Sequence, residues 1–592
     1  MTKGGLEAES PFHWLEYCTA MAMPDGCETI ALISSRVRLA GKRSIERALQ
    51  APLIAMMGGN MVGRALAAVV AVLLFLGGNV GSALAQKQGG ILRIPHRDNP
   101  PSASTLEEAT ISVTIPYMSI YNNLVLFDQS KPHESMETIV PDLATSWSWD
   151  DTKTKLTFKL REGVKWHDGK PFTAKDVQCT WHMLIGKSNN DDFRKNPRAI
   201  WYQNLAEVTI NGDYEATFVL KQPQPAFPLL LASGYSSVYP CHVPQREMRT
   251  KPIGTGPFKF VEYKRGESIK LVRNPDYWKK GRPFLDGIEF KIVENRSTRL
   301  LAFAAGDFDM TFPSDITIPL GRDMKSQAPK AICEFGPTGV TNNLIVNRSA
   351  PPFDKPEIRK AMSLALDRAS FSRILAEGQS KIGGAMLPAP QGEWGMPQEV
   401  LSKLTGYGSD VEKNQAEARK IMQGLGYSAE KPLKVKISTR NIAVYRDPAV
   451  ILIDQLKKIY IEGELENVDT PQWYAKVARK DYSVGMNLTG VSVDDPDANL
   501  VENYACKSDR NYTEYCNPEV DRLLSEQSKE GDKEKRKKIV WEIEKLLVDD
   551  AARPIIDHNV GGTCWHPHVK GFVVHDNAIY NNTRFEDVWL DK

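Results

Sequence analysis

The sequence predicts a large α/β protein of two lobes. From Gln86 onward, segments with the period of a strand alternate with segments with the period of a helix, and this mixing is typical of helices packed on sheets. The 592 residues are 42% hydrophobic and 25% charged, an ordinary globular composition with enough length for several buried cores. A net charge of +2 argues against a nucleic-acid partner.

The first element along the chain predicts export. Arg64 precedes an apolar run from Ala65 to Leu76, and the sequence Ala-Leu-Ala ends at Ala85. A basic start, a short apolar core and an A-x-A end are typical of a cleaved signal peptide, here 61–85. The apolar run is too short to span a bilayer comfortably.

Residues 1–60 precede that signal and contain a basic stretch that would hinder export. We therefore expect 1–60 to be a mis-called or unstructured extension. The residue after the predicted cleavage is Gln86 and not cysteine, so we expect a periplasmic protein that is not a lipoprotein.

Three half-buried strands are predicted next, because apolar and polar residues alternate in each segment. Five helices follow, with apolar residues at helical spacing and helix-stopping glycines after two of them. Asp354 and Glu357 form a D-x-x-E pattern around Pro356 that predicts the start of the first helix. The predicted strands are 155–160, 269–274 and 288–293, and the predicted helices are 354–377, 412–423, 447–461, 518–528 and 533–549.

Six cysteines lie after the predicted cleavage site, and an even number permits disulfides in an oxidising compartment. Cys506 and Cys516 enclose a short polar loop and are the best candidate pair. The partners of Cys179, Cys241, Cys333 and Cys564 stay open from the sequence alone.

Several fragments together resemble a known family. They are IVPDLATSWSWDD (139–151), LREGVKWHDGKPFTAKDV (160–177), KPIGTGPFKFVEYKRGESIKLVRNPDYWKKGRPFLDGIEFKIV (251–293), AAGDFDM (304–310) and PPFDKPEIRKAMSLALDR (351–368). In this order and spacing they resemble the family-5 extracellular solute-binding proteins of ABC importers, of the dipeptide- and oligopeptide-binding type.

The resemblance implies a two-lobed periplasmic-binding-protein fold of type II, the large cluster C form with an extra subdomain. By analogy, lobe I comprises 86–343 plus 559–592, and lobe II comprises 344–558. The segments 342–348 and 554–560 look like two hinge strands that join the lobes. The lobes would close on the ligand by a hinge motion.

The function that the resemblance implies is that of a receptor and not of an enzyme. It would capture di- or oligopeptides in the cleft and deliver them, as a monomer, to ABC permease subunits at the inner membrane, with no cofactor. The alternative is the same fold with a non-peptide solute: nickel, haem, an opine or an oligosaccharide.

The acidic stretch GVSVDDPDAN (490–499) matches the family's G-W-x-x-D pattern, in which the aspartate holds the amino group of the peptide. The resemblance assigns this ammonium-anchor role to Asp494, next to Gly490 and Val491. Val491 stands where the family commonly has tryptophan, which leaves the ligand open. We expect Asp495 and Asp497 to lie mostly in water.

A ligand carboxylate would suit the planar fork of an arginine. The segment ISTRNIAVYRDPA offers Arg440 and Arg446 with Tyr445 between them, and each arginine is a candidate for the cleft. Trp394 is a candidate apolar wall.

Three competing sites are weaker. His558, Cys564, His566 and His568 lack the spacing of a structural zinc site, so we expect no metal. Gly254 and Gly256 precede a strand and not a helix, which argues against a phosphate loop and predicts close backbone approach. A hydrolase with Asp494 and Asp497 as acid and base would need two distinct environments, of which the sequence gives no sign.

Overall fold

The computed structural model describes residues 86–188 and 192–592. The predicted extension 1–60 and signal peptide 61–85 lie outside the described residues. Residues 86–592 form one compact unit that mixes helices with sheets. Within the described part of the chain, no helix combines the length and the apolar character that crossing a membrane requires.

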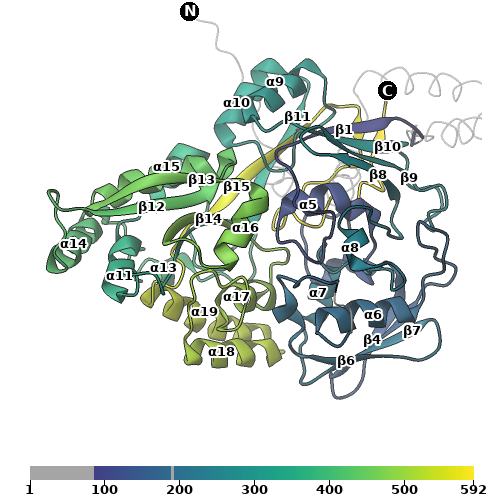
Figure 1. The fold of residues 1–592 in the computed structure, drawn as a ribbon, viewed down its shortest axis with the longest axis horizontal. Coiled ribbons are helices and arrows are strands. Elements are labelled where there is room, and N and C mark those ends of the chain that lie inside the picture. The colour runs from purple at the N-terminus through teal and green to yellow at the C-terminus, as the bar shows by residue number, and fades with distance from the viewer. Residues whose placement is uncertain (1–85, 189–191) are drawn as a thin grey trace, which may run out of the picture. The chain divides into compact units, whose positions relative to one another are not determined.

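The first sheet has the order β1-β10-β9-β8 (Figure 1), with β1 parallel to β10 and the other pairs antiparallel. The strands predicted at 269–274 and 288–293 are confirmed as β9 and β10, each shifted by one residue. Gly254 and Gly256 pass directly against Ile120: a Cβ on Gly254 would lie 1.8 Å from the Ile120 carbonyl oxygen. The predicted close backbone approach is therefore confirmed. The strands are β1 (Ile91–His96), β8 (Phe258–Lys264), β9 (Ser268–Arg273) and β10 (Gly287–Ile292).

The second sheet is antiparallel, has the order β4-β5-β7-β6, and is covered by α6 (Figure 1). The predicted strand 155–160 is confirmed as β5. Apolar residues alternate along its strands, and Phe158 packs edge-on against Phe218 at 5.5 Å between ring centroids. The elements are β4 (Ala144–Trp149), β5 (Lys155–Leu160), β6 (Leu205–Ile210), β7 (Glu215–Leu220) and α6 (Ala174–Leu184).

The third sheet, drawn in teal, green and yellow in Figure 1, has the order β13-β12-β14-β11-β15. β12 is parallel to β13 and β14, and α15 packs on all three of these strands. The strands are β11 (Ile332–Val346), β12 (Leu433–Arg440), β13 (Ile461–Val468), β14 (Val484–Gly490) and β15 (Ile555–Trp565).

β11 and β15 are long strands that pair with each other in antiparallel register. They connect the two halves of the unit, one with the first two sheets and the other with β12, β13 and β14 (Figure 1). They contain most of the segments predicted as hinge strands, 342–348 and 554–560, and extend well beyond them. The predicted lobe boundaries fall inside these two strands and stay a prediction.

The helix predicted over 354–377 is wrong as a single helix, because the structure has α11 (Pro356–Leu364) and α12 (Arg368–Ala376). Asp367 breaks the pattern: its side chain accepts a hydrogen bond from the Ser370 amide and caps a new helix. The D-x-x-E cap does not form either, since Lys355 is the N-cap residue and makes no side-chain cap.

The other four predicted helices are present. α14 (Val411–Gly424), α18 (Pro518–Lys529) and α19 (Lys533–Asp549) match their predicted ranges closely. α15 (Ala443–Lys457) begins and ends earlier than the predicted 447–461 and includes Pro448. Tyr445 and Arg446 therefore lie on a helix.

Three disulfides join the six cysteines after residue 85: Cys506–Cys516, Cys179–Cys241 and Cys333–Cys564. The last bond links β11 to β15 at paired positions of the ladder. The remaining elements are α5 (Ile111–Tyr117), η1 (Met118–Ile120), β2 (Val125–Phe127), η2 (Met136–Thr138), β3 (Ile139–Pro141), η3 (Ala199–Tyr202), α7 (Phe227–Ala232), α8 (Gln245–Met248), α9 (Arg296–Ala305), α10 (Ile318–Gln327), α13 (Gln398–Leu401), α16 (Thr470–Ala478), α17 (Pro496–Tyr504), β16 (Val569–Lys570) and β17 (Trp589–Leu590).

Candidate functional site

A small cavity of about 40 Å³ lies where β1, β12 and β14 end, beside β11 and β15. Arg97, which directly follows β1, and residues around the start of α5 line it together with residues from β12, α15 and α16. The carboxyl ends of strands in open α/β sheets are the usual place for a ligand. Because both halves of the unit contribute to this cavity, we take it as the candidate site.

An ion pair joins the two sides of the cavity. Arg440, the last residue of β12, donates from Nη2 to Asp98 Oδ2 at 2.9 Å, across 342 positions of sequence. Ser112 at the start of α5 and Thr470 at the start of α16 also donate to Asp98. Burial acts to raise the pKa of Asp98, but Arg440, His96 and Arg97 outweigh it and lower the pKa to about 2. Asp98 is therefore an anion that binds the two halves together.

Two tyrosines complete the surroundings of Arg440. Its Nη1 atom donates to the hydroxyls of Tyr445 and Tyr474, each at 3.0 Å. Burial acts to raise the pKa of Tyr474, but Arg440 and Arg510 outweigh it and lower the pKa. The phenol is thus exposed to a positive field from two arginines.

Arg510 is a second buried cation at the cavity, only 4% exposed. It pairs with Glu502 on α17 and donates to the Ala109 carbonyl at 3.2 Å. Glu502 is shared, because Arg198 lies 3.3 Å away from its other carboxylate oxygen. One carboxylate therefore faces two guanidinium groups.

Arg97, which follows β1, is the third arginine of the lining. Its guanidinium carbon lies 4.7 Å from the centroid of the Phe312 ring, a cation–π distance. Within residues 86–188 and 192–592, no hydrogen bond or ion pair of the Arg97 side chain is found, and its Nε is buried without a partner.

Three of the predicted site residues line this cavity: Arg440, Tyr445 and Gly490. Gly490 ends β14 and gives room to Tyr580, since a Cβ on Gly490 would lie 1.5 Å from the Tyr580 hydroxyl. Any larger side chain at position 490 would displace this tyrosine from the cavity wall.

Asp494 and Trp394 contact each other and lie outside the cavity lining. The Glu393 amide donates to Asp494 Oδ2 at 2.8 Å, and Trp394 Nε1 donates to the Asp494 carbonyl at 3.0 Å. Burial raises the pKa of Asp494 to about 7. Trp394 itself covers the Arg536 guanidinium at 4.6 Å. The ammonium-anchor role of Asp494 stays a prediction.

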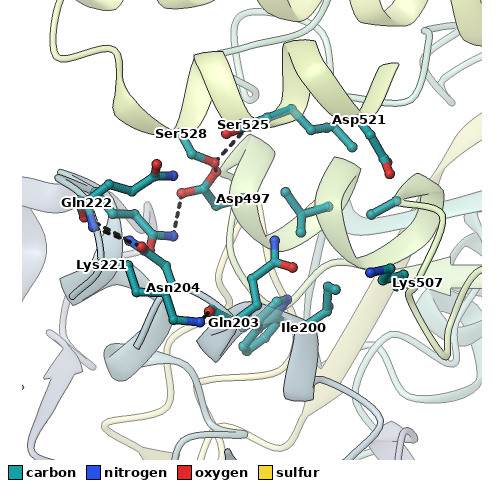
Figure 2. A pocket seen from close by; sticks show the side chains of 15 residues that line it. Ile200, Gln203, Asn204, Lys221, Gln222, Asp497, Lys507, Asp521, Ser525 and Ser528 are labelled. Carbon is teal, nitrogen blue, oxygen red and sulfur yellow. Dashed lines mark hydrogen bonds between the residues drawn. The ribbon is translucent and has the colours of Figure 1, made fainter. Parts of the chain in front are cut away.

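The expectation that Asp495 and Asp497 lie in water is wrong, because both are buried at 0% and 2% exposure. Arg536 on α19 binds Asp495 through two hydrogen bonds of 2.8 Å. Figure 2 shows Asp497 pointing toward Ser528, and Gln224 also donates to it at 2.8 Å. These partners come from distant segments, so the local sequence could not reveal them.

Figure 2 shows the polar hollow that contains Asp497, with a volume of about 410 Å³. It lies between η3, the residues that flank β6 and β7, and the helices α17 and α18. Of the predicted ligand-binding residues, none lines it, and we treat it as separate from the candidate site.

Two further predicted residues lie outside the cavity lining. Arg446 is exposed on α15 and donates to Asn441 at 3.1 Å. Val491 follows β14, donates its amide to the Gly339 carbonyl at 2.8 Å, and packs against the hydrophobic core. The cysteine and histidines of the rejected metal cluster have other partners: Cys564 pairs with Cys333, and His568 contacts Asp309.

Five residues in or beside the cavity were not predicted from the sequence: Arg97, Asp98, Tyr474, Arg510 and Tyr580. A signal existed for Arg97 and Asp98, since polar residues directly after a first strand occupy its carboxyl end. Arg510 and Tyr580 lie in irregular segments, where no local pattern points toward a cavity.

Two halves joined by paired strands, with a charged cavity between them, define a two-lobed periplasmic-binding fold. The model of bacterial extracellular solute-binding proteins, family 5 (middle region), matches residues 138–511. The chain belongs to this family.

Curated relatives agree with this assignment, and a solved structure has the same fold. A probable di/tripeptide-binding protein of Pseudomonas aeruginosa is 25% identical over 483 residues, 77% of this chain and 87% of its own length. The oligopeptide-binding protein AppA of Bacillus subtilis is 26% identical over 73% of this chain and 80% of its own length. The structure of Haemophilus influenzae OppA with the peptide RPPGFSPFR has the same fold, with a TM-score of 0.75 at 23% identity, covering 86% of this chain and 99% of that one.

Proposed function

We propose that the protein is the solute-binding component of an ABC importer, that it captures peptides in the cavity described above, and that it delivers them to a membrane permease. The observation that supports this most directly is the charged cavity lined from both halves, with Arg440 and Asp98 paired across it. Curated relatives are named as peptide-binding proteins. Export to the periplasm as a monomeric, non-lipidated protein belongs to the same proposal.

Ligand capture would proceed by lobe closure about β11 and β15. A cavity of about 40 Å³ holds two or three water-sized groups, which is room for one terminal group of a peptide and not for the whole ligand, and this group must enter while the lobes are apart. Closure then buries that group and forms the Arg440–Asp98 pair, which makes the closed surface available to the permease.

Thermal unfolding of the purified protein tests this proposal. We expect di- to pentapeptides to raise the unfolding temperature, because a ligand at 100 times its Kd adds about 2.7 kcal/mol to the free energy of unfolding. Nickel, haem and oligosaccharides serve as comparison ligands. Stabilisation by one of these, with no response to any peptide, would contradict the peptide proposal.

A separate measurement concerns Asp494. We expect Asp494→Asn to change the affinity for free-amino peptides by less than about twofold, because its carboxyl group lies outside the cavity and, with a pKa of about 7, is only partly ionised at neutral pH. Titration calorimetry with matched free-amino and N-acetylated peptides checks this. A selective loss of the free-amino peptides would instead support the predicted ammonium-anchor role of Asp494.

The same variant has a pH signature. The pKa of Asp494 is about 7 in the folded protein and near 3.8 in the unfolded protein. Its carboxyl group therefore lowers the free energy of unfolding increasingly as the pH rises from about 4 to 7. Asp494→Asn removes this opposition, and its gain in unfolding temperature over the wild type should therefore be larger at pH 8 than at pH 5.

A further inference from the structure

The cavity carries more positive than negative charge. Arg97, Arg440 and Arg510 line it, and none of its lining residues within the described chain is acidic. Behind the lining, Asp98 pairs with Arg440, and Glu502 is divided between Arg510 and Arg198. Two carboxylates thus face four guanidinium groups, all of them less than 10% exposed.

Arg97 is the cation that the described chain leaves without a countercharge in direct contact. It is 7% exposed, its Nε has no partner, its guanidinium lies over the face of the Phe312 ring, and its charge helps to lower the pKa of the neighbouring Asp98. A buried guanidinium without hydrogen bonds is costly, whereas its planar fork binds a carboxylate through two parallel hydrogen bonds. The donors of Arg97 are therefore available to an oxyanion in the cavity.

Among the described residues, the cavity offers no subsite for an ammonium group. An ammonium group requires a carboxylate or several free oxygen acceptors, and the nearby Asp98 and Glu502 are already engaged by arginines. Tyr474 offers its hydroxyl oxygen to Arg440 and lies in the field of two guanidinium groups. A cation placed here would be repelled by three arginines at short range.

We propose that the solute captured by this cavity is a net anion, whose carboxylate is bound by Arg97 in the positive field of Arg440 and Arg510, and whose amino groups, if it has any, are blocked. This inference rests on the proposed function, because it takes the inter-lobe cavity as the solute site. The carboxylate could belong to an N-blocked or acidic peptide or to a small organic acid. The cavity of about 40 Å³ matches the size of such a group in the closed form.

Four sets of probes separate these possibilities in calorimetric titrations of the purified protein. One peptide library carries free amino termini, amidated carboxyl termini and no Asp or Glu, so its members are cationic. A second has both termini free and is zwitterionic. A third is N-acetylated with free carboxylates. The fourth set contains succinate, glutarate and citrate. We expect the acetylated library or the organic acids to bind at least about tenfold more tightly than the cationic library.

The outcomes distinguish the two proposals. Tighter binding of the cationic or zwitterionic peptides would overturn the anion inference and leave the peptide function standing. Binding of the organic acids alone would support the anion inference and end the peptide proposal. No binding in any of the four sets would count against both.

The variant Arg97→Met separates a role of Arg97 in binding the anion from a role in stabilising the fold. Methionine keeps an unbranched side chain and removes the charge. We expect the affinity for the anionic probe to fall about 10- to 100-fold, while the unfolding temperature of the ligand-free protein rises or stays unchanged. Arg446→Met, on the exposed face of α15, is the matched control and should leave both values unchanged.

Two results for Arg97→Met would overturn the assignment. The first is unchanged affinity for the anion. The second is a lower unfolding temperature of the ligand-free variant with affinity reduced equally for anionic and neutral probes. Arg97→Lys, which retains the charge but loses the planar fork, should recover part of the affinity if the group bound is an oxyanion.

Discussion

Replacing Asp98 with asparagine should weaken ligand binding about 100-fold or more by disfavouring the closed form. Asp98 is 7% exposed and holds Arg440, which is 1% exposed. Removing one partner of a buried ion pair leaves the other charge without compensation and costs about 3–5 kcal/mol. Because 1.4 kcal/mol corresponds to a tenfold change, the loss of closure reduces affinity by two orders of magnitude or more.

The measurement combines titration calorimetry with small-angle scattering of the ligand-free protein, in which a larger radius of gyration reports separated lobes. Asp447→Asn is the matched control. Asp447 on α15 pairs with Arg296 on α9 at 2.7 Å, but its side chain is 40% exposed. Since the Arg296 side chain is 18% exposed, the pair is only partly buried and contributes less than a fully buried pair, so this variant should stay much closer to the wild type than Asp98→Asn. Equal effects of the two substitutions would contradict the special role of Asp98.

The Asp98 pair also predicts the pH dependence of closure. The pKa of Asp98 is about 2 in the closed form, below its ordinary value of 3.8. Because the pKa is lowered, the ionised Asp98 stabilises the closed form fully above about pH 4, and this stabilisation is lost as the pH falls toward 2. The wild type should therefore open in this window, and Asp98→Asn should lack the corresponding transition.

Removing the Cys333–Cys564 disulfide should cause the largest loss of stability among the three disulfides. The bond joins paired positions of β11 and β15 and closes a loop with a sequence separation of 231. In the chain-entropy model a loop of this length is worth about 5 kcal/mol, because the cross-link restricts the unfolded chain over the whole third sheet and its helices. The double variant Cys333→Ala, Cys564→Ala should unfold at a clearly lower denaturant concentration.

The double variant Cys506→Ala, Cys516→Ala is the control, since its disulfide spans a sequence separation of only 10. The same model gives about 3 kcal/mol for so short a loop. Equal shifts of the denaturation midpoint in the two double variants would show that loop length does not govern the effect. Retained ligand affinity in both would show that neither disulfide acts through the cavity.

Local periodicity predicted elements well wherever one face of a segment is buried. The strand at 155–160 and the helix at 533–549 have the predicted bounds, because their apolar residues repeat with a period that only one regular structure can bury. In the segment 354–377, periodicity alone gave the wrong helix. The apolar pattern of this segment continues through Asp367. The Asp367 side chain accepts a hydrogen bond from the Ser370 amide, however, and so caps a new helix.

The residues of the candidate site could be predicted only in part, because local periodicity does not reveal them. Arg440, Tyr445 and Gly490 belong to segments that the family resemblance connects with the ligand cleft, and all three line the cavity. Asp494, singled out by the same reasoning, lies against Glu393 and Trp394 instead. Asp495 and Asp497 are buried by Arg536, Gln224 and Ser528, whose side chains come from other helices and loops.

The sequence by itself determined the α/β class and the family, because order and spacing of motifs and hydrophobic period are properties of the chain alone. Only the tertiary structure decided which charges meet. Arg97, Asp98, Arg440 and Arg510 come from three distant regions, and their separation in sequence says nothing about their distances in space. Electrostatic interactions depend on those distances and on burial, so the net positive charge of the cavity became visible only when the two halves were placed together.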